Sequence, residues 1–510
     1  MRSWTGRGAV VFFAVAGVLA PAVAGPSGRL HLFFSSDPRV RADPVVVVVF
    51  DELPLVSLLT PGGEIDRKLF PSFARLADIS TWYRNTTTNQ TFTKEALPAL
   101  LTGSYPLREV HTTFRYPRNL FSLLGASHEI RAADVPSNLC RTDLCDAPIR
   151  PPRVPRLLGF GPGEKGSLFF SFLSGLEKAG RPRLHFLHLV LPHGPWRYLP
   201  SGQRYDEVDP MPGEVDRRGR GTSWVRDRWL VAQAYQRHLM QTRLVDELVG
   251  ALLVKLRRAG LLDDAVIVVT ADHGIGWEPG LPKRLPTEPT AGTLAGVPMF
   301  VKAPGLEPGV VSDVPAETVD VLPTIADLLD TPTWPDVDGV SLLTPDLPRR
   351  RTRSVVDVPL LEMRKARRRA ARAKYELVGH GGVVDLWKIA PGRSEELIGL
   401  RRDELEIGPP EGVTARASAL SRLVDADPQG PDFPSFFEGI LDGAGGRRPR
   451  VAVMVDGRIA AVTRAYESDG LTWFGVMLRP GLFGPREERV KLFVVDDVGS
   501  RALTKLPVAS

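Results

Sequence analysis

Two unbroken runs of β-branched residues constrain the fold of this chain most strongly. Residues 45–50 read Val-Val-Val-Val-Val-Phe and residues 266–269 read Val-Ile-Val-Val, without alternation between apolar and polar positions. Strands of this kind are buried on both faces, as in parallel sheets that helices cover on each side. A third run, residues 185–191, is a further buried strand, and we assign its His185 and His188 to the core. The runs predict the centre of an α/β sheet.

Helical periodicity precedes the strand expected at residues 265–270. Apolar residues recur at helical spacing from Leu230 to Leu256, and we interpret His238 within this segment as a packing residue. A helix followed by a parallel strand is the unit of a doubly wound sheet. We therefore expect residues 43–345 to form an α/β domain with a doubly wound, mostly parallel sheet. Further expected elements are helices at 70–77, 96–101 and 318–329, a strand at 297–301 and a polar loop at 85–91.

The pattern changes to short alternating strands past about residue 440. An Asp456-Gly457 turn separates residues 451–455 from residues 458–463, which is a strong hairpin signal. Two more strands are expected at 473–478 and 490–495. We therefore expect residues 441–510 to form a small β-rich, sandwich-like domain.

The intervening region, residues 346–440, is basic and is expected to be partly helical. It contains two dense basic runs, at residues 349–353 and 364–374. The second run is rich in Ala and Arg, which is compatible with a helix. A solvated helix face and contact with anionic lipid or polymer both remain open for this run.

The first 25 residues have the pattern of an export signal. Arg2 and Arg7 precede an apolar stretch at residues 9–23, which ends at Ala22-Val23-Ala24. We expect residues 1–25 to be a signal peptide or a membrane anchor, and the protein to be extracytoplasmic, either secreted or anchored. In an oxidising compartment Cys140 and Cys145 are expected to form a disulfide, and two unpaired buried thiols are the alternative.

The net charge of the protein favours anionic partners without specifying one. The formal net charge is +6 and the pI is about 9.3, but the arginines are widely spread. The sequence contains no zinc-knuckle spacing and no aromatic-plus-basic motif of the kind that binds single strands. We therefore predict no nucleic-acid partner.

Acids and histidines follow several of the expected strands. Ligands of open α/β sheets bind outside the carboxyl ends of the strands, so these side chains can share one crevice. An oxygen and nitrogen ligand set suits zinc or manganese better than calcium. Alone, either Asp51 or Asp272 could equally be a strand-end cap. The strand-end residues are Asp51, Glu52, His193, Asp272 and His273.

Thr93 is the candidate nucleophile because it stands at the start of an expected helix. A threonine hydroxyl beside a divalent cation can lose its proton near neutral pH, and helix amides help to hold the charge of an ester. Lys94, Lys283 and Arg284 are candidate contacts for the substrate anion, with ordinary surface charges as the alternative.

Five motifs, in order and at ordinary spacings, resemble the sulfatase branch of the alkaline-phosphatase superfamily. They are Leu100-Leu101-Thr102-Gly103 with Tyr105-Pro106, Pro192-His193 with Pro195, Thr270 to Gly274, Val297-Pro298 with Lys302 to Gly305, and Val319 to Thr324 with Asp338 to Leu342. The resemblance implies an alkaline-phosphatase-like fold and one divalent metal, held by Asp51, Thr93, Asp272 and His273, with Glu52 as a possible further acid. His193 would hydrogen-bond the transferred group or protonate the leaving oxygen.

The sequence departs from the family at two positions. True sulfatases have Cys or Ser, within C/S-x-P-x-R, where this protein has Thr93-Lys94-Glu95-Ala96-Leu97, so conversion to formylglycine is not expected. Threonine there resembles the transferases and pyrophosphatases that, by the same resemblance, work through a phospho-threonine. The second zinc site of related branches needs an Asp where Leu189 stands, so a single metal is expected.

Together these observations predict an exported single-metal hydrolase or transferase that acts on phosphate esters in preference to sulfate esters. An envelope lipid or a glycopolymer would suit the expected location and basic surface. A sulfuric ester hydrolase and a non-catalytic binding or scaffolding relative of the same fold are the alternatives.

Overall fold

The computed structural model describes most of the residues after position 42. The described residues are 43–105, 116–133, 139–145, 165–206, 211–216, 222–345, 360–417, 420–483, 490–497, 499 and 501–509. The expected signal or anchor at residues 1–25 and the basic run at 349–353 lie outside these ranges. The described residues all belong to one compact unit.

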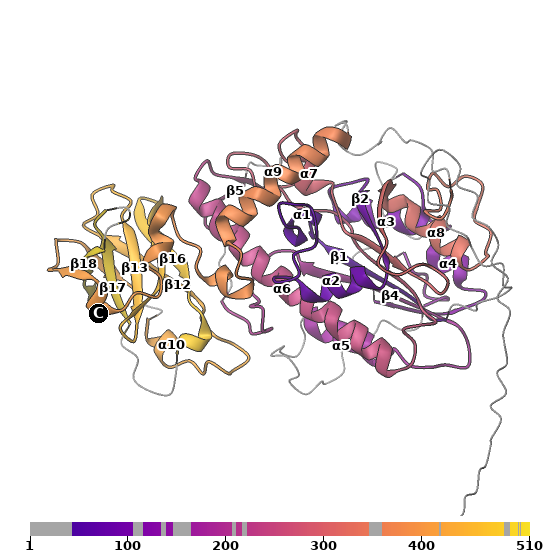
Figure 1. The fold of residues 1–510 in the computed structure, drawn as a ribbon, viewed down its shortest axis with the longest axis horizontal. Helices are drawn as coiled ribbons and strands as arrows, with labels where there is room; N and C mark the ends of the chain where they lie inside the picture. The colour runs from indigo at the N-terminus through magenta and orange to yellow at the C-terminus, as the bar shows by residue number, and fades with distance from the viewer. Residues whose placement is uncertain are drawn as a thin grey trace, which may run out of the picture. The chain divides into compact units, whose positions relative to one another are not determined.

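A seven-stranded sheet organises the first part of this unit (Figure 1). The order is β3-β4-β1-β7-β8-β2-β9, and β3, β4, β1 and β7 run parallel to one another. Strand β8 is antiparallel to both β7 and β2, whereas β9 is parallel to β2. The bounds are β1 Val45–Asp51, β2 Thr81–Thr87, β3 Glu129–Ala133, β4 Arg183–Pro192, β7 Val266–Ala271, β8 Met299–Lys302 and β9 Val311–Glu317. The expected α/β fold with a mostly parallel sheet is confirmed.

Alternate residues of β1 enter the two hydrophobic cores on opposite faces of this sheet. Val46, Val48 and Phe50 pack with apolar residues of one set of helices, and Val45, Val47 and Val49 pack with those of another set. The first set includes α2 Pro71–Asp78, α5 Lys165–Ser174 and α6 Arg228–Arg258. The second includes α3 Thr93–Thr102, α4 Leu120–Leu124 and α8 Val321–Leu328, with the short helix η1 Thr318–Asp320 before α8. Burial on both faces is why β1 shows no alternation.

The segment expected to be a loop at 85–91 is in part a strand, because β2 runs to Thr87. The side chains of Asn85 and Thr86 are buried and hydrogen-bonded. Asn85 donates from Nδ2 to the carbonyl of Asp313 at 2.8 Å, and Thr86 donates from Oγ1 to the carbonyl of Tyr83 at 2.7 Å. The expectation for residues 85–87 was therefore wrong, because internal hydrogen bonds allow polar residues in a covered strand.

A disulfide joins Cys140 and Cys145, whose Cα atoms lie 6.0 Å apart. The predicted pairing is thus confirmed. Both residues pack against the core that contains α3, α4 and α8.

The basic run at 364–374 lies within helix α9 Leu360–Val378, which packs against α7 Ala291–Leu294 and α1 Leu55–Leu58 (Figure 1). Lys374 is buried, and its ammonium donates to the carbonyls of Ser57 and Leu59 at 3.1 and 2.5 Å. The helix is therefore amphipathic and is only partly solvated. Its exposed basic side chains are Lys365, Arg368, Arg369 and Arg372.

Two five-stranded sheets form the C-terminal part. Their orders are β10-β18-β17-β13-β14 and β15-β16-β12-β11-β19, and residues of both sheets share one core. The predicted hairpin at the Asp456-Gly457 turn is present as β13 and β14. Strands β10 to β12 begin before residue 441, where we expected the β-rich region to start. The bounds are β10 Glu406–Gly408, β11 Thr414–Arg416, β12 Phe436–Asp442, β13 Arg450–Val455, β14 Arg458–Arg464, β15 Tyr466–Ser468, β16 Leu471–Met477, β17 Lys491–Val495, β18 Ala502–Leu506 and β19 Val508–Ala509.

The remaining elements are short. They are β5 Glu214–Asp216, β6 Thr222–Trp224, α10 Leu420–Val424 and the 3-10 helices η2 Val383–Trp387, η3 Gly392–Leu397, η4 Arg402–Glu404 and η5 Pro480–Leu482.

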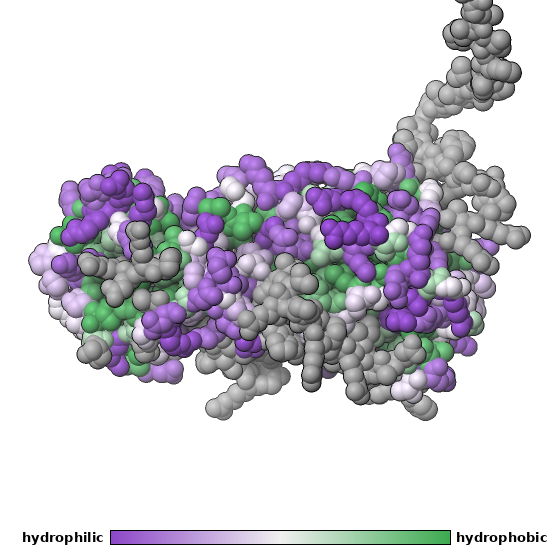
Figure 2. All heavy atoms as spheres, turned by 90° about the horizontal axis from the view of Figure 1, so that it is seen from below, coloured by the Kyte–Doolittle hydropathy of each residue, from purple (hydrophilic) through white to green (hydrophobic). Residues whose placement is uncertain are grey.

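The described surface is mixed in polarity. Figure 2 shows one face on which hydrophilic side chains predominate and hydrophobic side chains form separate patches. Within the described ranges, no helix is both long and apolar enough to span a bilayer.

Candidate metal centre and active site

The centre lies at the carboxyl ends of β1 and β7, which are neighbours in the middle of the sheet. Asp51 is the last residue of β1, and Asp272 follows the last residue of β7. The amide of Asp272 donates to the carbonyl of Phe50 at 3.0 Å, and the amide of Glu52 donates to Asp272 Oδ1 at 3.3 Å. These hydrogen bonds continue the pairing past the strand ends and bring the two carboxylates together.

Asp51, Asp272 and His273 form a buried group of three potential metal ligands. One ligand atom from each lies within 4.8 Å of the others. His273 Nε2 is 3.9 Å from Asp51 Oδ1 and 3.6 Å from Asp272 Oδ2. We call these three residues the ligand group. The structure thus brings together three of the residues that the strand-end pattern singled out.

The polar atoms of the ligand group fit a divalent cation. Among the described residues, Asp51 Oδ1 and Asp272 Oδ2 are buried and have no hydrogen-bond partner. Burial and the neighbouring Asp272 carboxylate raise the pKa of Asp51, so the charged form of this acid is destabilised in the protein alone. A bound cation would satisfy both oxygens and remove the repulsion. Carboxylate oxygens with one imidazole nitrogen suit zinc or manganese.

His273 is held in one orientation by its own backbone. Its Nδ1 donates to the carbonyl of Gly274 at 2.9 Å, which leaves Nε2 as the acceptor that faces the carboxylates. Gly274 is required here because a Cβ atom at this position would lie 1.9 Å from the carbonyl oxygen of Thr293. The Asp-His-Gly sequence therefore fixes the tautomer that can bind a metal.

Thr93 is the first residue of α3 and adjoins the ligand group. Its Oγ1 lies 3.5 Å from Asp51 Oδ2 and 3.3 Å from His273 Nε2. The side chain is thus at the positive end of a ten-residue helix and next to two of the three ligands. This position suits both roles that the sequence suggested, metal ligand and nucleophile.

Glu52 is not part of the ligand group and instead forms an ion pair with Arg284. The carboxylate accepts from Arg284 Nε at 2.8 Å and lies 2.6 Å from Nη2. Burial alone would raise the pKa of Glu52, but His193, Arg284 and Lys283 lower it well below its ordinary value. Glu52 is therefore an anion that holds the guanidinium in place.

His193 and Arg284 form the more exposed side of the site. The side chains of these residues are 31% and 25% exposed. His193 Nδ1 donates to the carbonyl of Gly194 at 2.5 Å, and Nε2 accepts from Arg284 Nη2 at 2.5 Å. In this arrangement the imidazole of His193 orients the guanidinium of Arg284.

The two lysines suggested by the sequence lie in different surroundings. Lys283 Nζ pairs with Glu214 at 2.5 Å and lies over the rings of Trp196 and Trp224, at 5.6 and 5.1 Å from their centroids. The Lys94 side chain is 64% exposed and lies 3.5 Å from Glu95. Of the three candidate anion contacts, Arg284 is the one that hydrogen-bonds to other residues of the site.

His188 is a site residue that the sequence reasoning placed in the core. It is fully buried, and its Nε2 lies 3.9 Å from Asp51 Oδ2 and 3.8 Å from Asp272 Oδ2. The strand register explains this position. His188 pairs with Val49, and Val49 and Asp51 lie on the same face of β1, so His188 lies on the face that carries Asp51.

The other two histidines pack as expected. His185 is buried against Phe172, with ring centroids 6.3 Å apart, and burial lowers its pKa to about 4. His238 lies among Trp196, Tyr235 and Trp277, and Nε2 donates to the carbonyl of Glu52 at 3.0 Å. Burial lowers the pKa of His238 to about 4, so its ring is neutral and supports the Glu52 backbone.

That backbone support matters because Glu52 has a φ of 58°, a conformation that non-glycine residues seldom adopt. The strand-end turn is therefore strained at the residue that holds Arg284, as is common at functional sites.

Comparison with known proteins gives a sulfatase match over part of the sequence. Residues 140–331 match the family model described as Sulfatase, a segment that contains His193, Asp272 and His273 and leaves out Asp51 and Thr93. A 103-residue segment is 37% identical to the choline-sulfatase of Rhizobium meliloti (strain 1021) and covers 19% of this chain and 19% of that protein. Part of this chain is therefore similar to the sulfatase family.

Solved structures that align with part of this chain were also found. The phosphonate monoester hydrolase SpPMH from Silicibacter pomeroyi has 19% sequence identity and a TM-score of 0.42, over 60% of this chain and 78% of that chain. A putative sulfatase from Bacteroides thetaiotaomicron VPI-5482 has 16% identity and a TM-score of 0.44, over 59% of this chain and 74% of that chain.

Proposed function

We propose that this protein is an exported, metal-dependent hydrolase or transferase of the sulfatase superfamily that acts on phosphate esters in preference to sulfate esters. The observation that carries the proposal is the placement of Thr93, whose hydroxyl lies 3.3 to 3.5 Å from two residues of the buried ligand group. A hydroxyl at this place can act as a nucleophile. The N-cap residue of α3 is Phe92, and the side-chain hydroxyl of Thr93 is directed to Asp51 and His273.

The ligand group and Thr93 would together hold one divalent cation. A bound cation would lower the pKa of the Thr93 hydroxyl and draw electron density from the ester.

Thr93 supplies the nucleophile of the proposed reaction. Its Oγ1 releases its proton to solvent and attacks the phosphorus atom in line with the leaving oxygen, so one O–P bond forms as the bond to the leaving group breaks. The phosphoryl group then passes from Thr93 to water or to an acceptor alcohol. The helix that starts at Thr93 presents its positive end to the transferred oxygens, which favours the extra negative charge.

Arg284 is the proposed contact for the transferred group. Its guanidinium is fixed by Glu52 and by the acceptor nitrogen of His193, and it remains partly exposed. A planar cation held in this way can bind two oxygens of a phosphoryl group. His193 then orients Arg284 and, once the arginine has bound substrate, can hydrogen-bond the leaving oxygen.

The preference for phosphate rests on the nucleophile. Threonine cannot become formylglycine, so the sulfatase chemistry that depends on that residue is not expected here. A phosphorylated threonine is an ordinary covalent species, which is consistent with phosphoryl transfer. Phosphate esters outside the cytoplasm include envelope lipids and glycopolymers, and we propose this class as the substrate.

Sulfate ester hydrolysis is the second candidate, because residues 140–331 match the Sulfatase family model. A panel of p-nitrophenyl phosphate, p-nitrophenyl phenylphosphonate and p-nitrophenyl sulfate separates the two. We expect turnover with zinc or manganese to be fastest with a phosphorus ester and to vanish in chelator and in Thr93→Ala. Fastest turnover of the sulfate would contradict the proposal. No turnover together with no stoichiometric metal binding would favour a non-catalytic relative.

A further inference from the structure

Helix α9 closes a small cavity that lies apart from the ligand group. The cavity has a volume of about 170 Å³ and is bounded by the turn at Gly62, by β2, by β9 and by α9. None of Asp51, Thr93, Asp272 and His273 lines it. Its charged and amide-bearing lining residues are Arg84, Asn85, Asp313, Arg364, Arg367 and Arg368.

The arginines of this cavity outnumber the carboxylates that could neutralise them. Asp313 is the acid among the lining residues, and Arg84 engages both of its oxygens, at 2.8 and 2.6 Å. Glu64 is a second acid beside the cavity, 3.8 Å from Arg84, so two carboxylates face four arginines. Arg364 lies 3.9 Å from the Asp313 carboxylate. Arg368 is exposed and makes no ion pair within the described part of the protein. Positive charge is therefore in excess at the cavity.

Neutral acceptors hold two of the arginines in position. Asn85 Oδ1 accepts from Arg364 Nε at 3.2 Å and from Arg367 Nη2 at 3.1 Å. Arg367 Nη1 donates to the carbonyl of Arg84 at 2.6 Å. These hydrogen bonds fix the guanidinium groups without cancelling their charge, which is how a preorganised anion site is built.

The charges also destabilise one another. The pKa of Arg367 is lowered to about 10, first by burial and then by three neighbouring arginines. The guanidinium groups remain charged at neutral pH, so a bound anion would offset their mutual repulsion.

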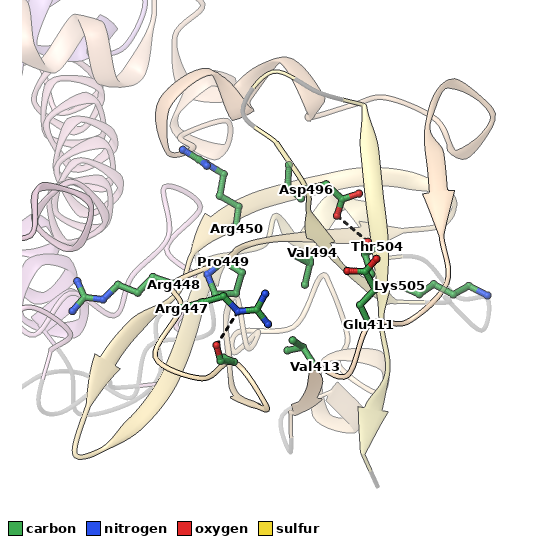
Figure 3. Close-up of a pocket in the computed structure, with 12 residues that line it drawn as sticks. Glu411, Val413, Arg447, Arg448, Pro449, Arg450, Val494, Asp496, Thr504 and Lys505 are labelled. Atoms are coloured by element: carbon green, nitrogen blue, oxygen red, sulfur yellow. Dashed lines mark hydrogen bonds between the residues drawn. The ribbon is translucent and has the colours of Figure 1, made fainter.

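A second arginine-rich cavity differs from this one in the directions of its arginine side chains. It has a volume of about 270 Å³ and lies in the C-terminal part (Figure 3). There Arg447 points into the hollow, whereas Arg448 and Arg450 point in other directions, and Arg448 lies 3.5 Å from Asp227. Its positive charges do not converge on one point.

We infer that the cavity between β2, β9 and α9 is a second oxyanion site, which binds a sulfate or phosphate group. The group is either a free ion or a substituent of a larger molecule. Helix α9 is packed closely against α7 beside this cavity, because a Cβ atom at Gly292 of α7 would lie 2.6 Å from the backbone nitrogen of Arg367.

Calorimetric titration with sodium sulfate and sodium phosphate tests the inference. The titrations use Thr93→Ala/Arg284→Gln protein in chelator, so that neither the ligand group nor the proposed anion contact of the active site competes for the anion. We expect binding to weaken at least about tenfold in Arg364→Gln/Arg368→Gln, because two charge-assisted contacts are lost. The matched control is Arg369→Gln/Arg372→Gln, which removes the same charge from exposed residues of α9 that do not line the cavity.

Absence of binding by the parent protein, or equal weakening by both double variants, would overturn the inference. Gly62→Asp serves if the first double variant does not fold, because it adds a carboxylate at the cavity where a Cβ atom makes only ordinary contact. Binding that persists unchanged in folded Gly62→Asp would equally overturn it. Titration with dextran sulfate identifies the source of the group. Binding that is tighter per sulfate than that of sodium sulfate, and is lost in the same variants, indicates a substituent of a polymer. Equal binding per sulfate indicates a free ion.

Discussion

Thr93 Oγ1 lies 3.3 Å from His273 Nε2, at the point where the first turn of α3 meets the end of β7. The two residues are far apart in the sequence, and the doubly wound sheet brings them together. The imidazole nitrogen that faces the hydroxyl is the acceptor, because Nδ1 is engaged by the carbonyl of Gly274. The contact places a potential nucleophile beside a potential metal ligand.

Removal of the Thr93 hydroxyl should abolish turnover without unfolding the protein. We expect Thr93→Ala to lower kcat about 10³-fold or more, as for other enzymes that lose their nucleophile. Thr93→Ser should retain activity because it keeps the hydroxyl. Steady-state kinetics and melting temperatures of the three proteins provide the check. Near-normal turnover by Thr93→Ala would remove Thr93 from the mechanism.

Replacement of Asp51 should have opposite effects on the metal-free and the metal-loaded protein. In chelator, Asp51→Asn should melt at a higher temperature than the parent, because burial and Asp272 destabilise the charged form of Asp51. With zinc or manganese, its metal affinity should fall at least about tenfold, because a ligand is lost. Thermal unfolding during a metal titration measures both effects. Unchanged metal affinity would show that Asp51 is not a ligand.

Glu52→Gln should separate metal binding from substrate binding. Glu52 pairs with Arg284 and lies outside the ligand group, so we expect the variant to keep stoichiometric metal. Its kcat/KM should fall about 10- to 100-fold because Arg284 is less firmly held. Metal analysis after dialysis measures the metal content of the variant, and steady-state kinetics measure its kcat/KM. Loss of metal to the extent seen in Asp51→Asn would make Glu52 a ligand.

Asp246 should impose a pH dependence on stability. This buried carboxylate accepts from the amides of Ser72 and Phe73 at the start of α2. Burial raises its pKa to about 6, despite these hydrogen bonds and Arg243. Between pH 4 and pH 6 the folded state therefore binds a proton that the unfolded state has released, so this group's contribution to stability falls as the pH rises.

Asp246→Asn keeps an acceptor for the α2 amides and removes the titration. Relative to the parent, its free energy of unfolding should rise by up to about 3 kcal/mol between pH 4 and pH 7. Urea unfolding of both proteins at the two pH values measures this difference. A difference that stays constant with pH would show that Asp246 does not titrate in this range.

The fold was predictable from the sequence where burial alone decides the pattern. Strand β1 has no polar position before its last residue because both of its faces are covered, and α6 has a continuous apolar face. Strand β2 was missed because its Asn85 and Thr86 are polar, and partners elsewhere in the fold satisfy them. Local sequence does not reveal such partners.

The candidate site was likewise predictable only in part. The Asp-His-Gly sequence after a buried strand indicated the ligands, because residues at strand ends share one edge of the sheet. His188 was assigned to the core because it lies within a strand, and only the register between β4 and β1 shows that it faces the ligand group. The contact between Arg284 and His193 depends on loop conformations, which residue types do not specify.

Peptide mass spectrometry of the zinc- or manganese-loaded protein, quenched shortly after addition of p-nitrophenyl phosphate, tests the central claim most directly. A phosphoryl group on the peptide that contains Thr93, absent from Thr93→Ala and from protein in chelator, is the predicted result. Turnover of the ester without any modification of this peptide would contradict attack by Thr93.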